Sequence, residues 1–368
     1  MTTSAANHCF RPGQIWPDDR GVPINAHGGG VLLHDGVHYW FGEHKIAGEA
    51  GNRAEVGVHV YSSPNLYQWR DEGIALAVSD EAGSPMEHGC ILERPKVIFN
   101  APTGKFVMWF HLEPKGAGYS GSLSGVAVAD RVIGPYEFVR AFRPNAGVWP
   151  ANVPAAEQRE LEPEKLALLA TMELGGGPRA YYPKHLLFRR DFAGGQMARD
   201  MTLFVDEDGL AYHIYASEGN GTLHISQLSA DFLSPAGKYV RVLPGRFNEA
   251  PAWFKVGGRY YMVTSDCTGW SPNPARLLAA DTIWGPWEEL GNPCLGSAQQ
   301  VATTFQAQST FVLPLPGRRD AFIFMADRWN PRDAIDGRYV WLPVEFRHGV
   351  PMIGWQEEWN LEFFDKMI

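Results

Sequence analysis

The sequence lacks both long apolar runs and an excess of positive charge. No stretch approaches the roughly 18 consecutive apolar residues that mark a candidate transmembrane helix, so we expect none. The chain carries 32 Lys and Arg against 41 Asp and Glu, which gives a net charge of −9. This acidic balance argues against nucleic acid and anionic membrane surfaces as partners.

Cysteine is also scarce. The four cysteines, Cys9, Cys90, Cys267 and Cys294, form no CxxC pair and no His/Cys pattern with the spacing of zinc ligands. We therefore expect no zinc site and no cofactor, and we expect four free thiols in a reducing compartment.

The N-terminal residues show no secretory signal. Residues 1–11 lack a basic region followed by an apolar core. A cytoplasmic location is therefore expected for the chain as written. A chain from which a leader had been removed would look the same and would be periplasmic or secreted.

The composition favours short strands over helices. Charged residues make up only 20% of the chain, whereas it holds 40 Gly, 27 Pro and 12% aromatic residues. Such a balance is typical of many strands joined by tight turns. The 13 Trp residues could supply sugar-binding platforms, although most Trp side chains in proteins belong to the core.

Five hairpin patterns recur along the chain. They span residues 30–41, 95–110, 201–215, 249–264 and 308–325, and each contains a turn signal such as Asp-Gly or Gly-Gly. A further apolar segment, which we interpret as a second pair of strands, follows each hairpin, within residues 58–69, 126–136, 223–232, 277–287 and 339–346. Five copies of a four-stranded unit predict an all-β, five-bladed propeller that forms one catalytic domain over residues 1–368. A two-sheet sandwich is the alternative, but sandwiches repeat less regularly.

The second repeat is longer than the others. Its excess lies near residues 140–195, where residues 155–170 have the pattern of a helix and the run Gly175 to Pro178 would end it. We interpret this segment as a partly helical insertion on a blade.

Glu249 stands directly before the hairpin that turns at Gly257 and Gly258. A carboxyl group beside Pro251 and Trp253, with few charged neighbours, is a candidate for a raised pKa. A general acid at neutral pH needs such a pKa. The alternative is an ordinary surface glutamate before a strand.

Polar residues also stand at the start of the innermost strands of the four remaining blades. In a propeller these strands line the central axis, so their first residues converge at one end of it. The set comprises Asn25, His27, Glu93, Arg94, Arg199, Asp200, Glu249 and Gln308. Three carboxylates with a His and a Gln, and no metal spacing, suit glycosyl transfer to water, which needs an acid and a group that positions or deprotonates water. Structural pairing of the carboxylates with the two arginines is the alternative.

These motifs resemble glycoside hydrolase family 43, in particular its exo-β-1,3-galactanase-like and arabinofuranosidase or galactofuranosidase branches. The resembling segments are residues 23–30, 93–97, 199–209, 249–251, 267–270 and 308–310. The resemblance implies an inverting five-bladed propeller hydrolase. It also implies that Glu249 is the general acid, that Asp200 tunes its pKa and orientation, and that Glu93 holds the terminal sugar.

The chain departs from the family pattern at the residue that serves as the catalytic base. The family's usual Asp in blade one is replaced here by Asn25 and His27. The galactanase-like branch shares this absence, and the resemblance implies that Gln308 holds the attacking water. His27 is the alternative for that role, and a structural His in the channel is equally compatible with the sequence.

Several other residues are candidates for substrate contact. Glu43 and Glu218 follow strands of blades one and three, and Trp270 and Trp329 are candidates for stacking on sugar rings. The acidic run at residues 206–208 resembles a calcium loop but is interpreted as a solvated turn. No metal ligand set is predicted, and a structural calcium in the axial channel stays open because some family members carry one.

The sequence thus predicts an inverting exo-glycoside hydrolase acting on an oligo- or polysaccharide. It would release terminal galactosyl units, from β-1,3-galactan or a β-D-galactofuranoside, or α-L-arabinofuranosyl units from arabinogalactan-type glycans. Two alternatives remain. One is a non-catalytic glycan-binding propeller, which the missing blade-one Asp keeps open, and the other is an endo-acting, arabinanase-like hydrolase. The oligomeric state is left open.

Overall fold

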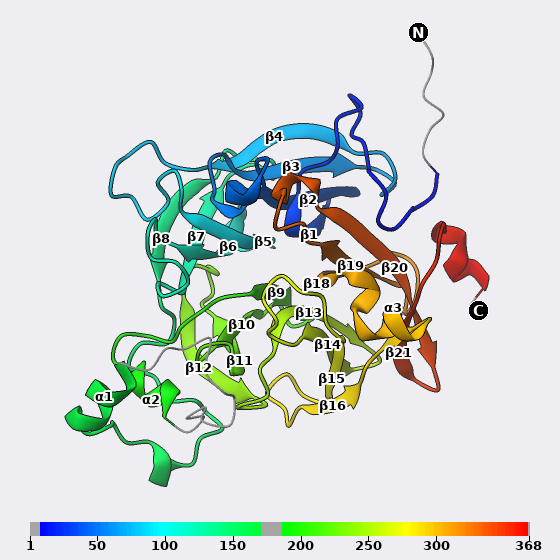
Figure 1. Ribbon diagram of the computed structural model, residues 1–368. Helices are drawn as coiled ribbons and strands as arrows, with labels where there is room; N and C mark the ends of the chain where they lie inside the picture. Colours follow the sequence, from blue (N-terminus) through cyan, green and yellow to red (C-terminus); the bar gives the residue numbers. More distant parts are fainter. Residues whose placement is uncertain (1–7, 171–185, 367–368) are drawn as a thin grey trace.

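A computed structural model describes residues 8–170 and 186–366 of the chain and shows five β-sheets arranged around one axis (Figure 1). Blade one comprises β1 (His27–His34), β2 (Val37–His44), β3 (Gly57–Ser63) and β4 (Arg70–Ala77). Blade two comprises β5 (Ile91–Asn100), β6 (Lys105–Glu113), β7 (Leu123–Ala129) and β8 (Glu137–Phe142). Blade three comprises β9 (Met201–Val205), β10 (Ala211–Ser217), β11 (Thr222–Leu228) and β12 (Pro235–Val242).

The last two blades complete the ring. Blade four comprises β13 (Glu249–Val256), β14 (Arg259–Ser265), β15 (Arg276–Ala280) and β16 (Glu288–Gly291). Blade five comprises β18 (Gln308–Pro314), β19 (Phe322–Arg328), β20 (Arg338–Arg347) and β21 (Val350–Gly354), with the short β17 (Cys294–Leu295) parallel to β21 at its edge. The predicted five-bladed propeller is confirmed, and the sandwich alternative is excluded.

The five hairpins lie where the sequence predicts them, but the outer strands differ from the prediction. Each apolar segment after a hairpin holds only the third strand of its blade. In blade one, for example, β3 ends at Ser63 and β4 begins at Arg70. A turn separates them because the Ser63 hydroxyl accepts a hydrogen bond from the Leu66 N–H at 2.8 Å, as expected of a Ser-Pro-Asn sequence.

Five hydrophobic cores lie between neighbouring blades, and each blade contributes one face to each of two cores. The innermost strands β1, β5, β9, β13 and β18 contact one another in that order, and β18 contacts β1 (Figure 1). Burial on both faces explains why the strands are so apolar and so rich in aromatic residues. The ring brings the first residues of all five inner strands to one end of the axis.

Helical turns are short and lie outside the sheets. They comprise α1 (Pro163–Ala170), α2 (Leu187–Arg190), α3 (Ala298–Ala302), η1 (Glu49–Asn52), η2 (Ala155–Glu157), η4 (Thr304–Gln306), η5 (Ala334–Asp336) and η6 (Leu361–Lys366). In the described part of the chain, no helix has both the length and the apolar character needed to cross a membrane.

The insertion connects β8 to β9 and packs against the outer strand of blade three. The Ala151 N–H donates to the Tyr239 carbonyl in β12 at 2.8 Å. The helix predicted over residues 155–170 begins only at Pro163, because proline favours the first position of a helix and disfavours helical geometry in the residue before it. The predicted break from Gly175 to Pro178 lies outside the described residues.

Candidate active site

Irregular strand starts shape the site at the axis. The pairing register shifts at the start of β1, β5, β13 and β18, which are the strands that carry His27, Glu93, Glu249 and Gln308. Such bulges bend a strand and turn its side chains in a new direction. In this protein they aim polar side chains at the end of the axis.

Three of these bulges contain a residue with positive φ, and each of those N–H groups is held by a carboxylate. The Gly28 N–H donates to Asp327 at 2.8 Å, and the Arg94 N–H donates to Glu43 at 2.9 Å. The Ala250 N–H donates to Asp200 at 3.1 Å. Left-handed backbone is costly for a residue with a side chain, so these bonds stabilise the strained conformation at Arg94 and Ala250.

Glu249 is the first residue of β13 and is contacted by two amides. Asn220 donates to its Oε2 at 2.8 Å, and the Gln308 Nε2 lies 3.4 Å from its Oε1. Both contacts come from neighbouring blades. The carboxyl group is therefore oriented from two sides at the end of the axis.

The environment of Glu249 favours its protonated form. Burial, followed by the negative charge of Asp200, raises its pKa to about 8. The charges of Arg94 and Arg199 and a hydrogen bond from Cys267 act in the opposite sense but are weaker. At neutral pH the group is mostly a carboxylic acid that can donate a proton, as the sequence predicts.

Arg94, in blade two, links polar groups of blades three and five. Its Nη2 contacts Asp200 at 2.8 Å and Gln308 Oε1 at 2.6 Å, and its Nη1 donates to the Ser309 carbonyl at 3.0 Å. Its guanidinium also lies 5.2 Å from the centre of the Trp329 ring. Arg94 and Asp200 therefore do form the ion pair that the alternative interpretation predicts. This pair is part of the candidate active site, so it does not argue against such a site.

The Gln308 amide is satisfied on all sides. Its oxygen accepts from Arg94 and from the Trp329 indole N–H at 2.8 Å, and its nitrogen donates to Ser265 Oγ at 2.9 Å and to Glu249. Two donors on the oxygen fix which end of the amide faces Glu249. Substrate or water can reach this amide most easily by replacing its longest contact, the one to Glu249.

Glu93 is the centre of a second cluster, built by blades one and two. Its Oε1 accepts from the Tyr119 hydroxyl at 2.7 Å and from Asn52 Nδ2 at 2.9 Å. Its Oε2 lies 3.1 Å from His111 Nδ1. Burial would raise the pKa of Glu93, but the hydrogen bond and charge of His111, with the charge of Lys45, hold it well below the usual range.

Comparison with known proteins shows to which family this protein belongs. The family model of glycosyl hydrolases family 43 matches residues 179–348. A family 43 β-1,3-galactosidase, solved with galactodeoxynojirimycin, is 52% identical, and the match covers 96% of this chain and 100% of that one with a TM-score of 0.89. The chain belongs to glycoside hydrolase family 43.

Two other relatives of this family 43 enzyme are more distant. The exo-β-1,3-galactanase of Phanerochaete chrysosporium, solved with β-1,3-galactotriose, is 29% identical over 96% of this chain and 68% of its own, with a TM-score of 0.75. The β-D-galactofuranosidase xynD of Aspergillus niger is 27% identical over 146 residues, which are 39% of this chain and 41% of that enzyme. The predicted glycosidase class is confirmed, and the alternative of a non-catalytic propeller is not supported.

A pocket of about 350 Å³ lies beside Gln308, between blades four and five of the family 43 fold. Trp270 and Trp329 line it, with ring centres 5.9 Å apart, and Trp270 is 42% exposed. The remaining lining is mostly amides and hydroxyls, including Asn273 and Gln306. The two tryptophans therefore lie where the predicted stacking on a sugar ring is possible.

Three other predicted contact residues are turned inward. Both ends of the Asn25 amide bond to the Lys45 backbone at 2.9 Å, and the Glu43 carboxylate pairs with the Lys45 ammonium. His27 is fully buried, and its ring stacks on Tyr339. These side chains support the inner strands, so the geometry does not favour His27 as a base or Asn25 and Glu43 as direct sugar contacts.

Glu218 likewise faces the interior. Its carboxylate is fully buried and contacts His224 Nε2 at 3.0 Å and Arg241 Nη2 at 2.8 Å. Burial opposes ionisation, but the hydrogen bonds to His224 and Arg241 outweigh it and lower the pKa of Glu218. The predicted substrate contact is not supported, because the carboxylate is already enclosed by its partners.

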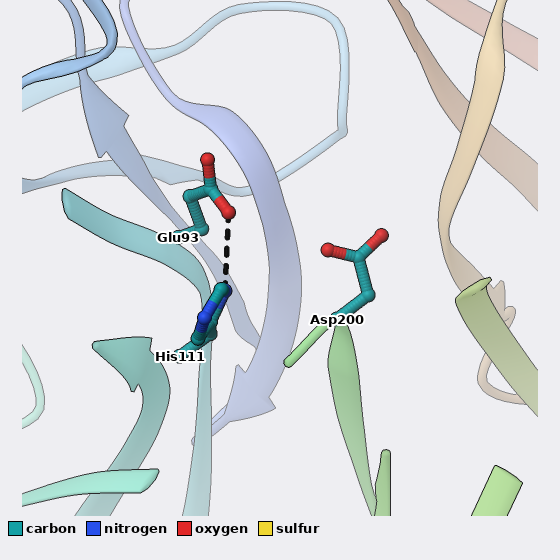
Figure 2. A group of neighbouring side chains, drawn as sticks. All are labelled: Glu93, His111 and Asp200. Atoms are coloured by element: carbon teal, nitrogen blue, oxygen red, sulfur yellow. Dashed lines mark hydrogen bonds and ion pairs between the residues drawn. The ribbon is translucent and has the colours of Figure 1, made fainter. Parts of the chain in front are cut away.

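Among the described residues, one group brings potential metal-binding atoms close together. Donor atoms of Glu93, His111 and Asp200 lie within 4.8 Å of one another (Figure 2). The group fits a metal poorly, because both His111 nitrogens face carboxylates and Asp200 is paired with Arg94. The expectation of no cofactor and no metal ligand set, with a structural calcium left open, stays a prediction.

The sequence prediction missed His111, Glu113, Asn52, Tyr119 and Asn220. One signal for the first two is visible in hindsight. His111 and Glu113 are the polar residues two positions apart at the end of an apolar strand, so both side chains point to the same face. The other three follow strand ends, where the sequence carries no periodic pattern.

Proposed function

We propose that this family 43 enzyme is an inverting exo-β-1,3-galactosidase, which removes single galactosyl units from the non-reducing end of β-1,3-galactan. The observation that carries the proposal is the position of the Glu249 carboxyl group, held by Asn220 and Gln308 where burial and the charge of Asp200 raise its pKa. The likeness to a β-1,3-galactosidase over its full length supports the galactosyl specificity.

In this proposal Glu249 donates its proton to the glycosidic oxygen while water attacks the anomeric carbon from the opposite face. The attacking water releases its extra proton to solvent water, and Glu249 regains a proton from solvent after the product leaves. Asp200 keeps Glu249 protonated and, through the Ala250 N–H, fixes the strand that carries it. Gln308 positions the water after the sugar displaces the contact between its amide and Glu249. Glu93 accepts a hydrogen bond from a hydroxyl group of the terminal sugar.

The pocket beside Gln308 suits the leaving part of the glycan. Its lining of amides, hydroxyls and two indole rings matches the polar edges and apolar faces of a sugar. We propose that Trp270 and Trp329 stack on this part.

A second candidate function is β-D-galactofuranosidase activity. It rests on the match to the enzyme of Aspergillus niger, which covers only 41% of that protein. α-L-Arabinofuranosidase activity rests on the family resemblance alone.

A substrate panel separates these activities. We expect galactose from β-1,3-galactan and from nitrophenyl β-galactopyranoside, and no product from nitrophenyl β-galactofuranoside, α-L-arabinofuranoside or β-xyloside. Proton NMR of the first product should show α-galactose, as inversion requires. Release of galactose from the furanoside alone would favour the second candidate, and early longer oligosaccharides would show endo action.

Glu249→Gln tests the acid. We expect kcat on β-1,3-galactobiose to fall by about 10²–10⁴, because the glycosidic oxygen leaves without a proton. The loss should be smaller with a nitrophenyl leaving group, which needs little protonation. The melting temperature and the binding of galactodeoxynojirimycin control for folding. A variant with near-normal turnover of galactobiose would remove Glu249 from the mechanism.

A further inference from the structure

The cluster around Glu93 continues into the interior through His111 and Glu113. His111 Nδ1 lies 3.1 Å from Glu93 Oε2, and Nε2 lies 2.9 Å from Glu113 Oε1 (Figure 2 shows the first contact). Glu113 is fully buried and also accepts the Ser122 N–H at 2.8 Å. Both partners of the ring are carboxylates, so both ring nitrogens act as donors and the ring is an imidazolium.

The surroundings of His111 agree with this charge. The ionisable groups around the Glu93–His111–Glu113 chain are Glu43, Lys45, Arg94, Tyr119, Arg143, Arg199 and Asp200. Burial alone would lower the pKa of His111, but the hydrogen bonds and charges of Glu113 and Glu93 raise it to about 9. The ring therefore stays charged across the neutral range.

The hydrogen bonds of Glu93 leave one place free. A carboxylate can accept about four hydrogen bonds, two at each oxygen. Tyr119 and Asn52 fill both places on Oε1, and His111 fills one of the two on Oε2. A donor from a ligand can therefore bind only at the second place on Oε2.

We infer that His111 and Glu113 are positioning residues that hold Glu93 as an anion with one acceptor place, directed at a hydroxyl group of the terminal sugar. This inference rests on the proposed function and assigns the residues behind its sugar-binding carboxylate. A hydrogen bond from a hydroxyl to a carboxylate is roughly twice as strong as one between neutral groups, so the charge on Glu93 contributes directly to substrate affinity.

Three variants test the inference. His111→Asn keeps a donor near the position of Nδ1 but carries no charge. Glu113→Gln keeps the ring and removes the charge behind it. His213→Asn is the matched control, because His213 is equally buried in blade three and has no hydrogen-bond partner among the described residues.

For His111→Asn, we expect KM on nitrophenyl β-galactoside to rise about tenfold with little change in kcat, because a binding interaction is lost in ground and transition states alike. Without the imidazolium the pKa of Glu93 rises, and a protonated Glu93 no longer offers the sugar hydroxyl a charged, strong acceptor. The acidic limb of kcat/KM should therefore move up by about one pH unit or more. The alkaline limb, set by Glu249, should stay in place.

For Glu113→Gln, the pKa of His111 should fall, so KM should rise between pH 7 and pH 8, where that of the parent stays flat because its His111 has a pKa of about 9. Monodeoxy galactosides add a direct readout of the partner hydroxyl. The deoxy galactoside that raises KM most for the parent should raise it little for His111→Asn, because the variant has already weakened the same hydrogen bond. His213→Asn should lower the melting temperature alone.

A readout independent of turnover covers variants that fail to fold. In the parent labelled with ¹⁵N-histidine, the His111 ring, identified by its shift in Glu113→Gln, should give imidazolium signals up to pH 8. A neutral ring at pH 7 would overturn the inference, as would KM and pH limbs in His111→Asn that match those of His213→Asn. A parent that releases no galactose would reject the proposed function, while the ring signals would still report the charge on His111.

Discussion

At the scale of single residues, Asp200 has both a structural and an electrostatic role in this enzyme. Asp200 accepts the Ala250 N–H, pairs with Arg94 and places a negative charge near Glu249. The first two contacts shape the bulge that carries Glu249, and the third keeps its proton in place. The geometry of the acid and its pKa therefore depend on the same side chain.

Asp200→Asn separates these effects. The amide can still accept the Ala250 N–H, but it no longer repels the ionised form of Glu249, so the pKa of Glu249 should fall. A general acid works only when protonated, so parent activity is lost as pH rises through about 8. In the variant we expect this alkaline limb of kcat/KM to lie about one pH unit lower, together with a reduced maximal rate.

A pH titration of kcat/KM measures the shift. Asp206→Asn is the control, because Asp206 pairs with Lys255 at 2.6 Å just beyond the far end of β9, away from Asp200. It should leave the limb unchanged. An Asp200→Asn profile that coincides with the parent's would show that burial alone sets the pKa of Glu249.

At the scale of elements, closure of the ring depends on side chains. Blades one and five are each built from consecutive strands, so among the described residues no strand is exchanged between the two blades. A core of aromatic residues joins them instead, with Trp40 and Trp69 from blade one and Trp341 from blade five. Phe10, from the N-terminal arm, stacks on Trp359 in this core with ring centres 4.4 Å apart.

Phe10→Ala tests this closure. Phe10 is 1% exposed, so its removal leaves a cavity, and we expect the free energy of unfolding to fall by about 3–5 kcal/mol. Urea unfolding followed by tryptophan fluorescence measures the change. Ile15→Ala on the same arm is the control: Ile15 is 58% exposed, so the expected change is within about 0.5 kcal/mol. A loss below about 1 kcal/mol for Phe10→Ala would show that the arm contributes little to closure.

At the scale of the whole molecule, the chain is a ring whose described ends meet. Phe10 and Trp359 exchange backbone hydrogen bonds of 2.7 and 3.1 Å. The insertion after β8 offers a surface loop in another part of the ring. Chain ends that lie close together, and exposed loops, are the features that let a protein tolerate circular permutation.

We therefore expect a circular permutant to stay active. Asp365 would be joined to Cys9 by a glycine–serine linker, and the chain would be opened between the exposed Arg159 and Glu160. Its kcat/KM should match the parent's, because all five inner strands remain intact. A second permutant, opened between Val60 and Tyr61 inside β3, should fail to fold. Loss of activity in the first would show that covalent continuity through the insertion is needed.

Much of this architecture could be predicted because its signals are local. Turn residues such as Gly257 and Gly258 mark the hairpins, and apolar runs mark strands buried on both faces. Repetition then places the starts of the inner strands at one end of the axis. For this reason Glu249, Asp200, Gln308 and Glu93 could be selected before any distance was known.

Only the tertiary structure decided which buried carboxylates keep a hydrogen-bond acceptor place open for a ligand. Glu218 and Glu93 look alike in sequence, since each stands near a strand of the inner hairpin. Arg241 encloses the first from 23 positions away, whereas the second keeps an acceptor place open beside His111. Sequence patterns record the period of a strand, but the partner of a buried charge depends on register and on blade packing, because the two groups meet only when the ring has formed.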